Sequence, residues 1–281
     1  MNAPLVTVIC LCYNHERFVI DALQSVLQQT YSAVQLIVVD DHSKDRSVCL
    51  INQFVKDNPF ITFIRHAENK GSCSSFNEAL KLAKGEFVVD LAADDVLLAD
   101  RIQIGVNALQ QSGNDYGVHF SDAEIISEQG ICLGNHSDRF PHDAIPQGDI
   151  YKELIKRYFI CTPTLMFRKK ILDELGGYDE TLAFEDFDFL IRSSRRYKFV
   201  YSSVVLVKRR LVHNSMSQQQ FKRSSDQRWS TLDVCKKIKS LNRSEEENRS
   251  LKIRLRYEIL LSLKLLDFKL ALSFYQLRRS I

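Results

Sequence analysis

The sequence contains no CxxC pair and no evenly spaced set of cysteines. Its seven cysteines are scattered and mostly sit inside apolar runs, which argues against a disulfide framework and favours buried thiols in a reducing compartment. Cys10 and Cys12 are two residues apart. Alternation along a strand explains this spacing without a thiolate metal site, because no second pair follows.

The sequence also lacks an apolar stretch long enough to cross a bilayer without charges. Its first residues, MNAPLVTVICLCYN, have no basic region of the kind that opens a signal peptide. We therefore expect a cytoplasmic protein with no nucleic acid partner. The formal net charge is only +3, but the positive excess is concentrated after about Lys208, which bears on contact with membranes.

Short β-branched runs alternate with amphipathic stretches through the first hundred residues. The expected strands are residues 6–12, 36–40, 61–65 and 87–91. The expected helices come from ERFVIDALQSVLQQT, from DRSVCLINQFVKDN and from residues 74–84. This order predicts an α/β fold with an open, largely parallel sheet and helices on both faces.

Polar residues follow each of these four strands, in CYNHE, DDHSKD, HAENKG and AADD. In open parallel sheets, ligands bind outside the carboxyl ends of the strands. The four segments are therefore predicted to place amides, carboxylates and a glycine along one rim.

The second half of the sequence is less regular. Residues 113–160 show no clear periodicity, and GNHSDRFPHDAIPQGD within them predicts a loop. TPTLMFR then predicts a strand, Gly176 and Gly177 a turn, and FEDFDFLIRSSRRY a helix opened by acids. We place a main domain at residues 1–220 and a helical, basic extension at residues 221–281.

The segment from Ser244 to the end is rich in both apolar and basic residues. Ser244 and Glu247 have the spacing of a capping box, and a long helix is expected beyond them. Its apolar residues suit packing on the main domain or on a partner subunit. Lysines and arginines flank those residues, so a basic amphipathic element lying on anionic lipid is the alternative.

Asp94 and Asp95 follow the apolar run of residues 87–91, and their chemistry has two interpretations. Mg2+ and Mn2+ take carboxylate oxygens, keep several waters and are shared with substrate phosphates, so the pair suits a cation held against a diphosphate. Alternatively, one Asp merely caps the following helix.

Taken in order, the motifs resemble glycosyltransferase family 2, the inverting nucleotide-sugar transferases of bacterial surface-polysaccharide type. The motifs are VTVICLCYNHERFVIDALQSVLQQTY, LIVVDDHSKD, ENKGSCSSFNEALKLAKGEFVVDLAADD, GGYDETLAFEDFDFLIR and VHNSMS, and they span about residues 4–217. The resemblance implies a GT-A fold, with a Rossmann-like open mixed sheet flanked by helices.

The resemblance also implies roles for individual residues. Those matched to the nucleotide pocket are Tyr13, Asn14, Glu16, Asp40, Asp41, Asn69, Gly71 and Asp94. Of Asp40 and Asp41, one contacts the base. Asp94 and Asp95 fall on the motif that contacts ribose and, through Mn2+ or Mg2+, the donor diphosphate.

The metal motif departs from the family pattern, because Ala92 stands where many members have an acid. We expect Asp95 as the direct ligand and Asp94 as a ribose or second-layer partner, with the reverse still open. His213 aligns with a histidine that completes the metal site in similar enzymes. A surface histidine on a loop is the alternative for that residue.

The segment AFEDFDFLIR carries the remaining chemistry. Asp186 matches the family's catalytic base, and Glu185 is expected near the acceptor. Asp188 is expected to be a solvated or capping acid, and Arg192, one turn further on, a partner for the carboxylates.

The resemblance implies a metal-dependent inverting glycosyltransferase that uses a UDP- or dTDP-linked sugar. Its acceptor would be a saccharide or a lipid-linked glycan, with peripheral membrane contact on the inner face of the plasma membrane. One alternative is a sugar-1-phosphate nucleotidyltransferase, although CYNHERF lacks the glycine-rich loop of that class. The other is a non-catalytic nucleotide-sugar-binding scaffold, against which Asp186 and His213 argue.

Overall fold

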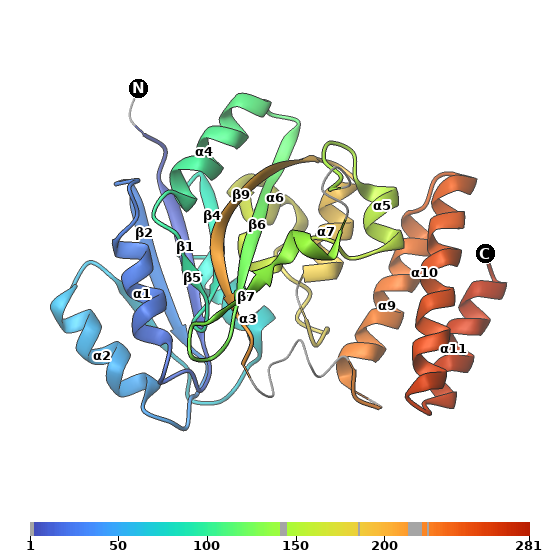
Figure 1. Ribbon diagram of the computed structural model, residues 1–281, viewed down its shortest axis with the longest axis horizontal. Helices are drawn as coiled ribbons and strands as arrows, with labels where there is room; N and C mark the ends of the chain where they lie inside the picture. The colour runs from blue at the N-terminus through green and yellow to red at the C-terminus, as the bar shows by residue number, and fades with distance from the viewer. Residues whose placement is uncertain (1–2, 141–144, 185, 213–220, 224) are drawn as a thin grey trace.

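The structure is a computed structural model that describes residues 3–140, 145–184, 186–212, 221–223 and 225–281. Its strands are β1 Val6–Cys12, β2 Val34–Asp40, β3 Thr62–Arg65, β4 Phe87–Ala92, β5 Val96–Leu97, β6 Tyr116–Ile126, β7 Cys132–Asn135, β8 Met166–Arg168 and β9 Lys198–Arg210. Across the described residues they form one nine-stranded sheet in the order β3-β2-β1-β4-β8-β6-β9-β5, with β7 paired to β6 (Figure 1).

Helices cover both faces of this sheet (Figure 1). They are α1 Val19–Leu27, α2 Ser47–Asp57, α3 Ser72–Leu80, α4 Arg101–Ser112, α5 Tyr151–Lys156, α6 Lys169–Leu175, α7 Asp186–Ser194, α9 Asp226–Leu241, α10 Glu245–Lys264 and α11 Phe268–Arg279. The predicted α/β class, with an open mixed sheet flanked by helices and a helical C-terminal part, is confirmed. Within the described residues, no helix is both long and apolar enough to span a membrane.

The first half of the chain follows the sequence prediction closely. Strands β1 to β4 are parallel to one another, and the expected first strand has the bounds of β1. Alternate residues of β1 point to opposite faces, so Val8 and Cys10 join the core under α1, α2 and α4, while Ile9 joins the core on the other face. Cys10 and Cys12 are buried and free, as alternation predicted.

The prediction of an irregular segment over residues 113–160 was wrong. This segment contains β6, a central strand of 11 residues that pairs in parallel with β9 and antiparallel with β7 and β8. The strand was not predicted because polar residues occupy buried positions at its centre, where the pattern of a strand requires apolar ones. These residues are His119, Ser121 and Asp122. Asp122 is satisfied from another segment, since the hydroxyl and the backbone N–H of Ser137 both donate to its carboxylate.

The C-terminal helices differ from the single long helix that the sequence predicted. α10 ends in a turn, and α11 begins afresh at Phe268, where the Asp267 carboxylate accepts the Leu270 N–H. Ser244 caps α10 by accepting the Glu247 N–H at 3.3 Å, but the Glu247 carboxylate binds the Arg243 N–H, so only half of the predicted capping box forms.

The inner faces of these helices pack on the main domain. Leu251, Leu255 and Phe274 are fully buried and belong to the same apolar cluster as Phe76 and Phe189 on one face of the sheet. The expected packing of the tail is therefore present. The boundary at residue 220 falls outside the described residues and stays a prediction.

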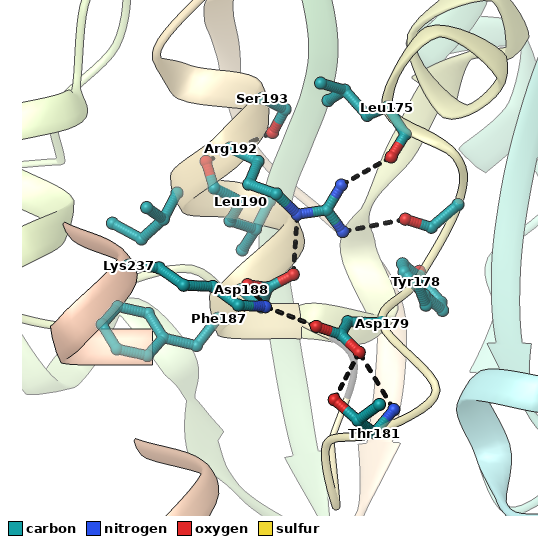
Figure 2. A network of polar contacts seen from close by, with 12 residues as sticks. Leu175, Tyr178, Asp179, Thr181, Phe187, Asp188, Leu190, Arg192, Ser193 and Lys237 are labelled. Atoms are coloured by element: carbon teal, nitrogen blue, oxygen red, sulfur yellow. Dashed lines mark hydrogen bonds and ion pairs between the residues drawn. The ribbon is translucent and has the colours of Figure 1, made fainter. Parts of the chain in front are cut away.

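A charged network ties α9 to α7 (Figure 2). Asp188 is 1% exposed, and its carboxylate accepts hydrogen bonds from Arg192 Nε and Lys237 Nζ, each at 2.7 Å. Lys237 also donates to Asp179. The prediction of Asp188 as a solvated or capping acid was wrong, because its partner Lys237 comes from a distant helix. Arg192 is a partner for a carboxylate, as predicted.

The same network shifts the pKa of Asp179. Although burial alone favours the neutral acid, hydrogen bonds from Lys237 and Thr181 lower the pKa of Asp179 to about 2. An acid with a lowered folded-state pKa stabilises the fold above its unfolded pKa of about 3.9, and this stabilisation is lost as the pH falls towards 2.

Replacing Lys237 by Met is expected to lower the free energy of unfolding by about 1–3 kcal/mol at pH 7, because buried Asp188 then keeps a single cationic partner. Urea denaturation measures this. The neighbouring Lys236→Met is the control, since Lys236 forms an exposed pair with Asp233 and the loss of such a pair should change stability by less than about 0.5 kcal/mol.

The difference in the free energy of unfolding between Lys237→Met and the wild type should shrink as the pH falls from about 4 towards 2, where Asp179 becomes protonated in both proteins. Equal losses in the Lys236 and Lys237 variants would contradict a stabilising role for this network.

Candidate active site

The loops that follow β1 and β2 are bonded to each other at the carboxyl end of the sheet, the lower end in Figure 1. The Asn14 N–H donates to Ser43 Oγ at 2.8 Å, and the Lys44 N–H donates to Asn14 Oδ1 at 2.7 Å. The Arg46 N–H donates to Glu16 Oε2 at 2.8 Å. Asn14 and Glu16, predicted to line the nucleotide pocket, therefore use their side chains to shape the loop after β2.

Asp41 fixes the loop that follows β3. Its two carboxylate oxygens accept the N–H groups of Lys70 and Gly71, each at 2.8 Å, and His66 Nδ1 lies 2.8 Å from Oδ1. The Asn69 amide donates to the Asp41 carbonyl. Gly71 has φ +84°, which a side chain would strain. The predicted residues Asp41, Asn69 and Gly71 thus lie together, with the carboxylate of Asp41 already occupied.

Asp40 differs from Asp41 in that one of its carboxylate oxygens accepts no hydrogen bond from the described residues. The Ser43 N–H donates to Asp40 Oδ1 at 2.9 Å. Asp40 is 0% exposed, and its Oδ2 has no hydrogen-bond partner among the described residues. A buried carboxylate oxygen normally has a donor, so Asp40 retains one unused acceptor position. Tyr13, at the end of β1, is 45% exposed.

Asp94 and Asp95 lie in the turn after β4, against the end of β9. The Arg210 N–H donates to Asp95 Oδ1 at 2.8 Å, and Arg210 Nε donates to the Asp94 carbonyl at 3.0 Å. His15 Nε2 lies 3.9 Å from Asp94 Oδ2. Burial, followed by the charge of Asp94, raises the pKa of Asp95 well above its usual range. A cation bound at this pair would relieve that unfavourable burial of negative charge.

The donor set of this turn fits Mg2+ or Mn2+ in kind but is incomplete. Among the described residues, no three His, Cys, Asp or Glu side chains converge as a metal site. The side chain of Ala92 offers no oxygen, and His213 lies outside the described residues. Two carboxylates suit an ion that keeps several waters and shares ligands with phosphates.

Asp186 is the first residue of α7, where the helix dipole favours a negative charge. Tyr158 OH and Thr162 Oγ1 donate to its Oδ2 at 2.8 and 2.7 Å, and the Phe187 N–H donates to Oδ1. These bonds hold the carboxylate in one orientation. Glu185, the predicted neighbour, lies outside the described residues.

The sequence analysis missed several residues around Asp186. Asp90 lies in β4, where Tyr178 OH donates to its Oδ2 at 2.8 Å. Burial, and secondarily the charge of Asp186, raises the pKa of Asp90 to about 7. A lone carboxylate inside the apolar run FVVDLA was the available signal. Tyr158 lies in the segment without periodicity, and Thr162 opens TPTLMFR, which predicted only a strand, so neither residue carried such a signal.

Comparisons with known proteins agree with this architecture. The family model of glycosyl transferase family 2 matches residues 7–176. The Escherichia coli UDP-Glc:alpha-D-GlcNAc-diphosphoundecaprenol beta-1,3-glucosyltransferase WfgD is 28% identical over 173 residues, which cover 62% of this chain and 64% of that enzyme. Matches to five further curated glycosyltransferases span between 30% and 72% of their length.

Two solved structures share the fold at low sequence identity. Staphylococcus aureus TarS 1–349 in complex with UDP-GlcNAc has a TM-score of 0.68 and 17% identity, over 89% of this chain and 71% of that one. The Pyrobaculum calidifontis mannosyltransferase PcManGT in complex with GDP-Man and Mn2+ has a TM-score of 0.64 and 17% identity, over 99% of this chain and 83% of that one.

The family model spans more than half of the chain, and its N-terminal motifs form the rim built by the carboxyl ends of β1 to β4. The chain belongs to glycosyl transferase family 2 and is a glycosyltransferase.

Proposed function

We propose that this enzyme is a metal-dependent inverting glycosyltransferase that moves a sugar from a UDP- or dTDP-linked donor to a saccharide or lipid-linked glycan in surface polysaccharide synthesis. The observation that carries the proposal is the buried Oδ2 of Asp40, which has no hydrogen-bond partner in the described part of the chain and lies on the rim that also bears Asp94 and Asp95. The name of the Escherichia coli relative supports the UDP-sugar and the diphosphate-linked lipid acceptor.

The nucleotide is held by the ends of β1 and β2. Asp40 Oδ2 accepts an N–H of the base, which gives this oxygen the donor that it lacks. Asp41 acts indirectly by holding the backbone of Lys70 and Gly71 in place. The exposed ring of Tyr13 offers an apolar face beside the base.

The donor diphosphate lies at Asp94 and Asp95. When bound there, Mn2+ or Mg2+ stabilises the charge that develops on the leaving diphosphate as a Lewis acid. Asp95 is the proposed direct ligand, because Arg210 holds one of its oxygens in place, and the more open Asp94 faces the ribose. His213 follows Arg210 by three residues, a chain length of at most about 10 Å, so it can complete the ligand set.

Asp186 is the proposed base. It takes the proton of the acceptor hydroxyl while that oxygen attacks the anomeric carbon on the side opposite the nucleotide, which inverts the configuration. Tyr158 and Thr162 orient the carboxylate, and the start of α7 favours its ionised form. Glu185 is proposed to contact the acceptor.

The family assignment argues against the two alternatives. A sugar-1-phosphate nucleotidyltransferase would release pyrophosphate from a nucleoside triphosphate, and a scaffold would bind the donor without transfer. Both are distinguished from a glycosyltransferase by following the sugar of a labelled donor.

Asp186→Asn is expected to keep donor binding and to lower the transfer rate by about 10²- to 10⁴-fold, because the amide cannot accept the hydroxyl proton. Binding is measured by calorimetry and transfer by product release. Asp173→Asn, on α6, is the matched control, since the exposed Asp173 pairs with Lys169 of the same helix and its substitution should leave the rate unchanged. A normal rate in Asp186→Asn would refute the assignment of the base.

Nucleotide-sugars are expected to raise the melting temperature, and Mn2+ to raise it further, because ligands that bind only the folded state stabilise it. UDP-, dTDP- and GDP-sugars should be compared. Asp95→Asn should lose the increment due to Mn2+ and keep the shift due to the nucleotide, whereas Asp40→Asn should lose the shift due to the nucleotide. An Asp95→Asn protein with the full Mn2+ increment would show that the cation binds elsewhere.

A further inference from the structure

The turn between α10 and α11 carries a group of exposed apolar side chains. Leu260, Leu263, Leu266, Phe268 and Leu272 are each between 44% and 63% exposed. All five lie within six residues of Leu266, so they surround one end of this helical hairpin. We call this group the hairpin tip. The residues that hold the two helices on the domain are different ones, among them Leu255 and Leu270, which are fully buried.

Leu266 occupies a backbone position that disfavours leucine. Its φ is +56°, and the turn is closed by hydrogen bonds from the Leu266 N–H to the Leu263 carbonyl and from the Asp267 N–H to the Ser262 carbonyl. This is the helix-ending turn in which glycine is usual, since a side chain is strained there. Leucine is thus disfavoured at this position for two reasons: the backbone conformation is strained, and the apolar side chain is exposed to solvent.

The surroundings of the hairpin tip are basic. Lys264 and Lys269 are exposed beside its apolar residues. Residues 248–281 contain eight Lys and Arg residues and only two acids, Glu258 and Asp267. Both acids are buried. A second copy of the same tip would bring like charges together, whereas an anionic lipid surface complements both the apolar and the basic groups.

The hairpin tip lies at the same end of the molecule as the active-site rim. α10 begins beside α5, where Lys152 contacts Glu246 at 2.7 Å, and its 20 residues run about 30 Å from there to the tip. In Figure 1 the turn between α10 and α11 is at the lower end, as are the ends of β1 and β2 that carry the site. A surface touching the tip would therefore face the rim.

We propose that the hairpin tip inserts its apolar side chains into the headgroup region of an anionic bilayer, with Lys264 and Lys269 on the lipid phosphates. Side chains of this kind enter by about 5–10 Å, a depth that the tip residues suit. Contact at the tip places the rim towards the bilayer, where a lipid-linked acceptor is carried. The statement that this contact brings the rim close to a lipid-linked acceptor rests on the proposed function. The lipid contact itself does not.

Flotation of the full chain with vesicles, without donor, tests the contact. The wild type should bind vesicles of phosphatidylcholine and phosphatidylglycerol and bind pure phosphatidylcholine weakly. Phe268→Ser should lower the partition coefficient about tenfold, as the loss of one buried aromatic side chain predicts. Lys264→Glu should lower it about tenfold on the anionic vesicles only.

Leu266→Gly separates lipid binding from folding. Glycine relieves the strain at φ +56°, so the melting temperature should not fall, while binding to anionic vesicles should weaken several-fold. Truncation is a poorer test, because the helices also contribute buried residues to the core.

Two substitutions serve as matched controls. Phe60 is 67% exposed just before β3, at the opposite end of the sheet, and Lys81 is exposed after α3. Phe60→Ser and Lys81→Glu should leave vesicle binding unchanged.

Three results would overturn the proposal: equal binding by the wild type and Phe268→Ser, equal binding to both vesicle types, or a dimer in light scattering that Phe268→Ser dissociates. Transfer to a soluble acceptor should be the same in all tip variants. A failure of the lipid contact is thereby distinguished from a failure of the proposed activity.

Discussion

The burial of several carboxylates around one rim is the constraint on which this structure depends. A buried negative charge is tolerated only when donors, a cation or a proton offset it. Asp40, Asp41, Asp90 and Asp95 are buried, and Asp94 and Asp186 are half-buried. Each is offset differently, and the differences separate residues that shape the site from those that can receive a ligand.

Asp41 is saturated by backbone N–H groups and so acts as part of the scaffold. Asp40 is only half satisfied, and Asp95 has one oxygen fixed by Arg210 and a raised pKa. These two are the positions at which a base and a cation would lower the free energy of the folded protein. Asp90 is offset by Tyr178 and by its raised pKa, so it adds less charge beside Asp186. The unbalanced charge is thus confined to the places where a nucleotide-sugar would bind.

The C-terminal helices contact the main domain next to Asp186. Lys237 of α9 neutralises Asp188, two residues after Asp186, so the start of α7 is fixed by a helix outside the family match. The opposite faces of α10 and α11 remain apolar and basic at the hairpin tip. One set of helices therefore supports Asp186, the proposed base, on its inner side and carries the proposed lipid-binding surface on its outer side.

The sequence by itself determined the parallel half of the sheet, the rim and the family. Strands β1 to β4 are regular apolar runs, and the polar residues that follow them must meet at one edge, since parallel strands share their carboxyl ends. Local patterns carry this information because most residues of β1, β2 and β4 are buried. The same reasoning failed for β6, whose central polar residues are buried and bonded to other segments.

Only the tertiary structure decided how each acid is used. The partner of Asp95 lies 115 residues away and that of Asp188 lies 49 residues away, and no local pattern encodes such pairs. The distinction between Asp40 and Asp41 likewise depends on which backbone N–H groups the folded loops bring close. The burial of a charge depends on its three-dimensional surroundings. The sequence therefore identified most of these carboxylates, whereas Asp90 and the partners of each acid became visible only in the folded structure.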